Sequence, residues 1–371
     1  RLYELGDRQT RNEIRYICGK VLKGFIETMN KLKIRYDAFD WESDLIWDGT
    51  VRDVLTRLGK SGYLKTHPGD SSKFLDIRGA AKDNKNILDI IFEGRKGDID
   101  EIKNPVLIRK DGSTLYTLRD IAYALHKLNR LKADRVLNVI GVDQKLEQKH
   151  VIIALMLLGE KDVTNRYVHV AYELVRLPGV RMSSRKGQYI TLDALINEVV
   201  NRAYNEVTKR YPEMREEPKQ TISREIGIGA LKYALLSSMP SKVITFEWDR
   251  VLDFEQNSGP FIQYAHARAA SILRKIGWDL PTKADFSRLT SEEEFELVYK
   301  LSMFPEIIED VMETLRPDLL CTYANELAIL FNKFYQKHPV LKAEDGIKAV
   351  SYTHLRAHET EADLVCRLLL E

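Results

Sequence analysis

Hydrophobic positions recur at different spacings along the chain, and the changes divide it into regions. Residues 12–31 place apolar side chains three or four positions apart, which predicts an amphipathic helix. Residues 35–104 instead hold short apolar runs separated by polar turns, which predicts strands within a small α+β region. The runs expected to form strands are RYDAFDW, SDLIW, KFLDI and NILDIIF.

From residue 105 onward, short apolar runs alternate with longer stretches of helical spacing. This alternation predicts a parallel sheet with connecting helices. The expected strands are 105–109, 135–142 and 167–177, and the expected helices between them are 118–129 and 145–159. Beyond residue 191 almost every stretch has helical spacing, and we expect a domain boundary near residues 248–255. The predicted fold class is therefore α/β followed by an all-α region.

Composition narrows the class of protein without naming a function. The 371 residues, 44% of them hydrophobic, are enough for two or three domains with cores. The 57 basic and 55 acidic residues nearly balance, so a polyanionic partner must be bound by local patches. Cys18, Cys321 and Cys366 form no CxxC pair, and no apolar run is long enough for a membrane span. We expect a cytoplasmic protein that does not bind a membrane.

The stretch GVDQKLEQKH, residues 141–150, follows an apolar strand and opens a helix. Ligands of open α/β sheets bind at the carboxyl ends of the strands, where a helix N-terminus adds free N–H groups. Asp143 and Gln144 would then lie at the ligand-binding edge of the sheet. The alternative, equally open from position alone, is that Asp143 only caps the helix.

Tyr116 and Asp120 lie four residues apart in LYTLRDIAYALH and share one face of the predicted helix. A carboxylate can accept two parallel hydrogen bonds from a planar guanidinium, and a neighbouring tyrosine can stack on it. The pair would suit a cationic ligand. Taken alone, the residues favour a plainer interpretation, in which Asp120 caps the helix or pairs with Arg119 or Arg109.

A basic loop, LPGVRMSSRKG at residues 177–187, combines hydroxyl groups with cations after a Pro-Gly turn. Backbone N–H groups and cations in such a loop can bind the phosphates of a nucleotide. A solvated basic loop is the common alternative. The candidate phosphate-binding residues are Arg181, Met182, Ser183, Ser184, Arg185 and Lys186.

The stretch SGPFIQYAHARAASILRK presents an apolar helix face opposite a face with Tyr264, Arg268, Ser271 and Lys275. Aromatic and cationic residues on an exposed face can stack on unpaired bases and bind phosphates, although such a face is more often simply solvated. The expected apolar positions are Phe261, Ile262, Ala265, Ala269, Ile272 and Ile276.

Three other patterns carry no site in our interpretation. GKS at residues 59–61 is not a Walker A motif, because Val54 occupies the position of its first glycine. Gly227 and Gly229 form a GxG inside a predicted helix, which helix packing explains better than ligand binding. The eight histidines include no HExxH, so we expect no protein-bound metal.

In this order, four stretches resemble arginyl-tRNA synthetase, a class I aminoacyl-tRNA synthetase. They are KDGSTLYTLRDIAYAL, VLNVIGVDQKLEQKH, VHVAYELVRLPGVRMSSRKG and DFEQNSGPFIQYAHARA. The resemblance covers about residues 1–349. It implies an arginine–tRNA ligase that activates L-arginine with ATP, accompanied by Mg²⁺, and transfers it to the 3′-terminal ribose of tRNA(Arg).

The resemblance also implies roles for matched positions. Tyr116 and Asp120 would bind the substrate's guanidinium, and Gln144 would contact the same substrate. ATP-binding positions would be Gly141 and Asp143, joined by Met182 and Ser183. RMSSRKG resembles the KMSKS loop, with Arg181 and Ser184 in place of its two lysines, so either Arg185 or Lys186 would supply the missing charge. The tRNA-binding candidates are Tyr264, Arg268 and Lys275.

The family organisation predicts five segments. Residues 1–104 would be a connective insertion of the catalytic domain, and residues 105–191 the second half of a Rossmann-like catalytic domain. Residues 192–252 would form a helical stem-contact region and residues 253–349 a helical-bundle anticodon-binding domain. We expect residues 350–371 to be a non-native tail translated from a sequencing adaptor. A monomer is expected.

The HIGH motif of class I synthetases does not occur in the chain. We therefore expect a fragment that lacks the N-terminal half of the catalytic domain and cannot form arginyl-adenylate. Alternatives are a catalytically silent RNA-binding relative, another class I enzyme such as the cysteinyl one, or a nucleotide-binding α/β protein with a helical interaction domain. Asp120 discriminates the arginine-specific interpretation from the others.

Overall fold

The computed structural model describes residues 2–179, 190–276, 287 and 289–338, which fall into two compact units. Unit 1 comprises the chain up to Phe25 together with Tyr36–Tyr172, and unit 2 comprises Ile26–Arg35 and the chain from Glu173 onward. Helix α1 (Arg8–Lys31) spans the first boundary, and its presence confirms the helix predicted at residues 12–31. None of the described helices is long and apolar enough to cross a membrane.

The first part of unit 1 surrounds a small antiparallel sheet with the strand order β1-β2-β3. The strands are β1 (Leu64–Thr66), β2 (Lys73–Leu75) and β3 (Val106–Ile108), and the helices are α2 (Glu42–Trp47), α3 (Thr50–Lys60), α4 (Ile77–Asp83), α5 (Asn86–Phe92) and the 3₁₀ turn η1 (Ile99–Glu101). The strands expected in KFLDI and at residues 105–109 are present, but the second of them pairs antiparallel with β2 and does not join the predicted parallel sheet. Lys60 ends α3, so GKS does not precede a helix as a phosphate loop would.

Three of the predicted strands in this region are wrong. SDLIW lies in α2, NILDIIF forms α5, and RYDAFDW has no regular structure. Short apolar runs have no periodicity that separates strand from helix, so their ends decide. The side chain of Asn84 accepts a hydrogen bond at 3.1 Å from the N–H of Asn86, the first residue of α5. Acidic residues in the first turn of α2 suit the positive end of that helix.

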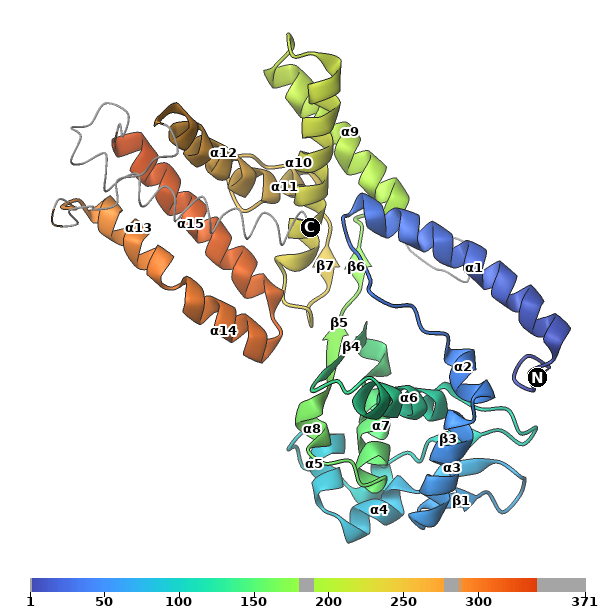
Figure 1. Cartoon of the computed structure of the whole chain (residues 1–371). Helices are drawn as coiled ribbons and strands as arrows, with labels where there is room; N and C mark the ends of the chain where they lie inside the picture. Colours follow the sequence, from blue (N-terminus) through green and yellow to red (C-terminus); the bar gives the residue numbers. More distant parts are fainter. Residues whose placement is uncertain (1, 180–189, 277–286, 288, 339–371) are drawn as a thin grey trace. The chain divides into compact units, whose positions relative to one another are not determined.

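The second part of unit 1 contains two parallel strands and the helices beside them (Figure 1). In chain order it contains α6 (Tyr116–Leu125), the π-helical turn η2 (His126–Arg130), β4 (Val136–Gly141), the 3₁₀ turn η3 (Val142–Gln144), α7 (Lys145–Leu157), α8 (Val163–Arg166) and β5 (Tyr167–Tyr172). Val136 pairs with Tyr167 and Gly141 with Tyr172, which confirms the predicted parallel pairing. The strand expected over 167–177 is interrupted after Tyr172 and resumes as β6 (Val175–Arg176) in unit 2.

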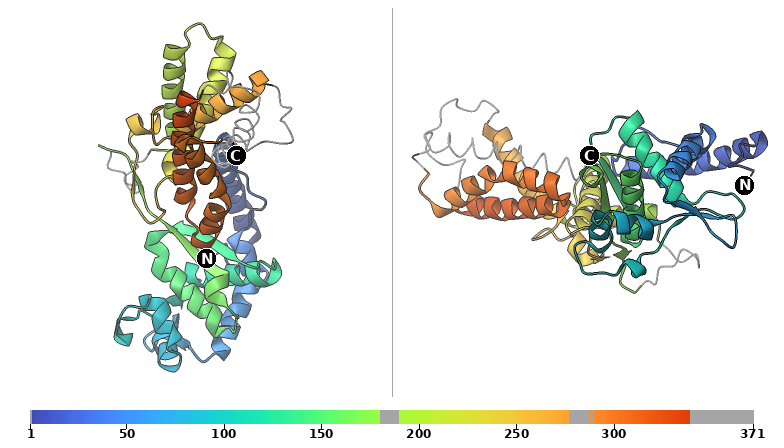
Figure 2. Two further views of the ribbon diagram at one scale, coloured as in Figure 1. Left: turned by 90° about the vertical axis from the view of Figure 1, so that its left-hand side faces the viewer. Right: turned by 90° about the horizontal axis from the view of Figure 1, so that it is seen from below.

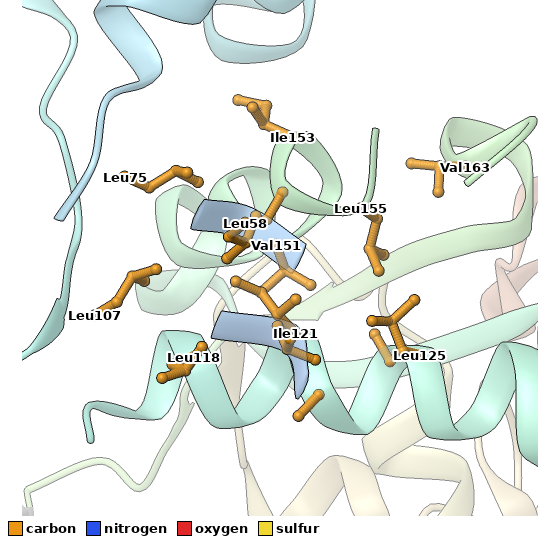
Figure 3. Close-up of a cluster of buried hydrophobic side chains, with 14 of the residues drawn as sticks. Leu58, Leu75, Leu107, Leu118, Ile121, Leu125, Val151, Ile153, Leu155 and Val163 are labelled. Carbon is orange, nitrogen blue, oxygen red and sulfur yellow. The ribbon is translucent and has the colours of Figure 1, made fainter. Parts of the chain in front are cut away.

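A core of aliphatic side chains fixes α6 against α7 (Figure 3). Leu118, Ile121 and Leu125 recur every three or four residues on α6 and are at most 4% exposed. Val151 and Leu155 of α7 are fully buried in the same cluster. Each such side chain contributes about 1.5–3 kcal/mol by leaving water. The polar residues on the same two helices therefore lie on a rigid frame.

Unit 2 is mostly helical (Figures 1 and 2). Its elements after β6 are α9 (Leu192–Arg210), α10 (Glu216–Leu236), β7 (Ile244–Thr245), α11 (Trp248–Val251), α12 (Gly259–Ile276), α13 (Glu292–Ser302), α14 (Phe304–Thr314) and α15 (Pro317–Lys337). One apolar cluster joins α9 to α10, and a second joins α12, α13 and α15. The helical pattern predicted beyond residue 191 is confirmed in the described residues.

Glycines allow three of these helices to approach closely. A Cβ on Gly227 would lie 2.9 Å from the Cα of Val200 on α9, and one on Gly259 would lie 2.6 Å from the carbonyl oxygen of Gly229. No side chain fits at either crossing. Gly227 of the GxG in α10 is therefore a packing position, and Gly229 of the same motif provides the backbone against which Gly259 packs.

Candidate functional site

Tyr116 and Asp120 lie one turn apart at the start of α6, as the sequence predicts. Tyr116 is the first residue of the helix and is 60% exposed, and its ring centroid lies 5.6 Å from the Arg119 guanidinium. Asp120 is half-buried. The two side chains combine an open aromatic face with a partly desolvated carboxylate.

The plainer interpretations of Asp120 are wrong. The N-cap of α6 is Leu115, so Asp120 does not cap the helix. Arg119 pairs with Glu42 at 3.2 Å, and Arg109 donates to the Ser113 hydroxyl at 3.4 Å. Neither arginine neutralises Asp120.

The surroundings of Asp120 disfavour its charge. Burial, together with the negative charges of Glu147 and Glu42, raises the pKa of Asp120 to about 6. A hydrogen bond from Gln148 and the positive charge of Lys127 oppose that shift. Burial in turn lowers the pKa of Lys127. A cation that reached Asp120 would relieve the repulsion among three carboxylates.

The side-chain amide of Gln148 links Asp120 to the two parallel strands. Gln148 is fully buried in α7 and donates from Nε2 to Asp120 Oδ2 at 3.4 Å. Its Oε1 accepts hydrogen bonds from Asn138 Nδ2 at 2.7 Å and from the Tyr167 hydroxyl at 2.9 Å. The sequence analysis missed these three residues. Two indications were present: Asn138 interrupts the apolar strand VLNVIG, and Gln148 follows Gln144 by one helical turn.

The strand-end candidates lie where β4 passes into α7. Gly141 ends β4, Asp143 lies in η3, and Gln144 is the N-cap residue of α7. Neither α7 nor η3 has a side-chain cap hydrogen bond, so Asp143 does not cap a helix there. A Cβ on Gly141 would lie 2.6 Å from Asp143 Oδ1, the end of an exposed side chain that could move aside. Asp143 and Gln144 are both exposed at this edge.

The basic loop lies outside the described residues. Its candidates are Arg181, Met182, Ser183, Ser184, Arg185 and Lys186. The segment 350–371 lies outside them as well.

A second polar surface lies on α12 and α15 in unit 2. Arg268 donates to Asn332 Oδ1 at 2.7 Å and to the Tyr264 hydroxyl at 3.1 Å. Its guanidinium carbon lies 4.3 Å from the ring centroid of Tyr264 and 5.2 Å from that of Tyr335. Both tyrosines remain exposed, as does Lys275 in the last turn of α12. We call Tyr264, Arg268, Asn332 and Tyr335 the tyrosine–arginine face; the sequence analysis missed Asn332 and Tyr335.

The opposite face of α12 is buried as predicted. Its described members are Phe261, Ile262, Ala265, Ala269 and Ile272, each at most 6% exposed. The side chain of Ile276 lies outside the described part of the chain. Within that part, no group of three or more His, Cys, Asp or Glu side chains could hold a metal ion.

Comparisons with known proteins point in one direction. The family described as tRNA synthetases class I (R), catalytic domain, matches residues 14–248, and the DALR anticodon binding domain matches residues 262–359. An arginine–tRNA ligase of Korarchaeum cryptofilum is 41% identical over 340 residues, and one of Ignicoccus hospitalis is 39% identical over 344. These matches cover 89% and 92% of this chain but 52% and 53% of the relatives.

Solved structures share the fold. The arginyl-tRNA synthetase of Thermus thermophilus superimposes with a TM-score of 0.83 at 27% identity, covering 97% of this chain and 63% of that protein. The enzyme of Plasmodium falciparum gives a TM-score of 0.76 at 19% identity, covering 98% of this chain and 58% of that protein, and supports the fold alone. The chain spans about half the length of the curated relatives it matches.

Proposed function

The chain belongs to the arginyl-tRNA synthetase family of class I tRNA synthetases, and from this we propose that it forms part of an arginine–tRNA ligase. In the proposed reaction the α-carboxylate of L-arginine attacks the α-phosphate of ATP, which enters with Mg²⁺, and pyrophosphate leaves. The arginyl group then passes to the 3′-terminal ribose hydroxyl of tRNA(Arg), and AMP leaves.

The observation that carries the proposal is the state of Asp120. Its carboxylate is half-buried beside Glu147 and Glu42, and among the described residues no ion pair joins it to a lysine, arginine or histidine. Removing a carboxylate from water without a partner is unfavourable. A guanidinium supplies the charge and two parallel donors in one plane. Tyr116 on the same helix face would cover that plane, and Gln144 would contact the rest of the substrate.

We assign the nucleotide to the carboxyl end of β4. Gly141 and Asp143 would lie against the adenosine, since strand ends followed by a helix N-terminus are the usual ligand edge of such sheets. The phosphates would be bound by the loop from Arg181 to Lys186, with Met182 and Ser183 nearest the nucleotide. Arg185 or Lys186 would provide the charge of the missing second lysine.

RNA binding is assigned to unit 2. The tyrosine–arginine face offers two exposed rings for stacking on unpaired bases, and Arg268 and Lys275 would bind phosphates. The match to an anticodon-binding domain over residues 262–359 supports this assignment. Residues 253–349 would then read the anticodon, and residues 192–252 would contact the stem.

Calorimetric titration with three amino acids tests the substrate. L-arginine should bind the 371-residue chain, whereas L-citrulline, whose neutral ureido group has nearly the shape of guanidinium, should bind about 100-fold more weakly or not at all. L-lysine, a point charge without the planar fork, should also bind more weakly. Equal affinity for arginine and citrulline would refute the guanidinium assignment. Binding of tRNA without any binding of arginine would instead identify an RNA-binding relative that does not activate the amino acid.

A further inference from the structure

The hydrogen bonds of the buried Gln148 side chain fix which end of its amide faces Asp120. Asn138, Gln148 and Tyr167 contact one another in pairs, because Asn138 Nδ2 also lies 3.0 Å from the Tyr167 hydroxyl. Gln148 and Tyr167 are 0% and 2% exposed, so water cannot substitute for these contacts. We call these three residues the amide ring. Its members come from β4, α7 and β5, three elements packed within unit 1.

The hydrogen bonds within the amide ring leave one N–H donor, that of Gln148, for Asp120. Asn138 donates to Gln148 Oε1 and to the Tyr167 oxygen, and the Tyr167 hydroxyl also donates to Gln148 Oε1. With two donors on Oε1, the Nε2 group of Gln148 is left to donate to Asp120 Oδ2. Reversing the amide would aim a carbonyl oxygen at the carboxylate, an arrangement suited only to a protonated Asp120. The described orientation therefore matches an ionised Asp120.

We propose that Gln148, oriented by Asn138 and Tyr167, is a positioning residue that fixes the plane of the Asp120 carboxylate and favours its charged form. One lone pair of Oδ2 is used by Gln148. Within the described part of the chain no other hydrogen bond reaches this carboxylate, so Oδ1 and the second lone pair of Oδ2 stay available for two N–H groups of a planar cation. This inference rests on the proposed function for the identity of the ligand, but not for the effect of Gln148 on Asp120.

Other charged groups around Asp120 act in both directions. Glu147 on α7 and Glu42 on α2 disfavour the carboxylate, and Lys127 on η2 favours it. Thr117 donates to Glu147 at 2.7 Å and holds that carboxylate between α6 and α7. None of these residues is altered in a Gln148 variant. A change in the titration of Asp120 in a Gln148 variant would therefore report on the amide itself.

The test compares Gln148→Met with Tyr167→Phe and with the control His150→Leu. Methionine has nearly the shape of glutamine without the amide. Tyr167→Phe removes one donor to Gln148 without touching Asp120. His150 is 6% exposed and lies two residues beyond Gln148 on the same helix, outside the amide ring. The first readout is the titration midpoint of the Asp120 carboxyl, followed by ¹³C NMR and assigned with Asp120→Asn. The second is the affinity for L-arginine against pH.

Gln148→Met should raise the Asp120 midpoint by about one unit and weaken L-arginine binding about tenfold. Tyr167→Phe should also raise the Asp120 midpoint and weaken L-arginine binding, each by a smaller amount. His150→Leu should change neither the midpoint nor the affinity. A folded Gln148→Met protein with an unchanged midpoint would overturn the inference. If that variant does not fold, an unchanged midpoint in Tyr167→Phe would overturn it equally.

The two proposals can fail separately. If the unaltered chain binds no L-arginine, the proposed substrate is wrong, yet the Asp120 midpoint still decides the role of Gln148. If arginine binds and the midpoint does not respond, the amide ring is only structural while the proposed function stands.

Discussion

The α6–α7 site and the tyrosine–arginine face present opposite charges by opposite means. Asp120 is half-buried near two other carboxylates, and the amide of Gln148 and the positive charge of Lys127 favour its ionised form. Arg268 instead lies between exposed aromatic rings and bonds to a neutral amide and a hydroxyl. The carboxylate is held in a place that disfavours its charge, whereas the half-buried guanidinium is held by neutral groups beside two exposed rings.

This difference fits two kinds of ligand. A small cation must be distinguished from neutral molecules of similar shape, which requires desolvation so that charge dominates binding. Stacking on an unpaired base needs open planar groups, and phosphate binding needs a cation that is not already neutralised. At the Asp120 site, burial of the carboxylate therefore lowers local stability and should increase selectivity for a charged ligand. At the tyrosine–arginine face we expect no such loss of stability. Four predictions examine that contrast, from the largest expected effect to the smallest.

Asp120→Asn should separate the two surfaces most strongly. We expect L-arginine affinity to fall about 100-fold or more, because the neutral amide cannot match the guanidinium charge. Affinity for tRNA(Arg), measured by fluorescence anisotropy, should change by less than about twofold, since Asp120 lies in a different unit from the tyrosine–arginine face. Parallel loss of both affinities would mean that the substitution disrupts the fold instead of the site.

Lowering the pH should weaken the binding of L-arginine at Asp120 while the charge of Arg268 stays the same. The pKa of Asp120 is about 6, and only the ionised carboxylate attracts the guanidinium, so affinity is full above that pH and decreases below it. Calorimetry at about pH 5 should give roughly tenfold weaker binding than at about pH 8. Arginine stays protonated throughout this range. In Asp120→Asn the pH dependence should disappear; if it persists, another group controls it.

Arg268→Ala should reduce tRNA affinity about five- to tenfold through loss of a phosphate contact and of the support for two rings. Arg268→Lys should recover part of that loss, because lysine keeps the charge but not the planar stacking. The slope of affinity against salt should decrease for alanine and remain for lysine. A parallel decrease in the affinity for L-arginine would contradict the independence of the two surfaces.

The smallest expected effect is on stability. Because the folded-state pKa of Asp120 is raised, its charge destabilises the fold above about pH 6, and this cost disappears as the pH falls below its ordinary range near about 4. Asp120→Asn should therefore increase the free energy of unfolding by about 1 kcal/mol near pH 8, after allowance for solvent screening. Urea titrations of both proteins at about pH 8 and about pH 4 measure this difference in the free energy of unfolding. A loss of stability near pH 8 would show that Asp120 is kept for structure.

Sequence reasoning succeeded where the evidence was local. Tyr116 and Asp120 share a helix face through their spacing alone, and the parallel pair of strands follows from the alternation of runs between residues 135 and 172. It failed for SDLIW and NILDIIF, because short apolar runs fit a strand or a helix equally well and only their flanking contacts, such as that of Asn84 with the first N–H of α5, distinguish the two.

The sequence by itself determined the chemical types in the site and the helices and strands that carry them. Only the tertiary structure decided which partners Asp120 acquired. Asn138, Gln148 and Tyr167 meet because β4 pairs with β5 and α7 packs beside them, and no local periodicity records such a contact. The same is true of Arg268, whose partners Asn332 and Tyr335 come from a helix more than 60 positions further along the chain. Burial and charge depend on such distant neighbours, so the state of Asp120 became apparent only once the chain was folded.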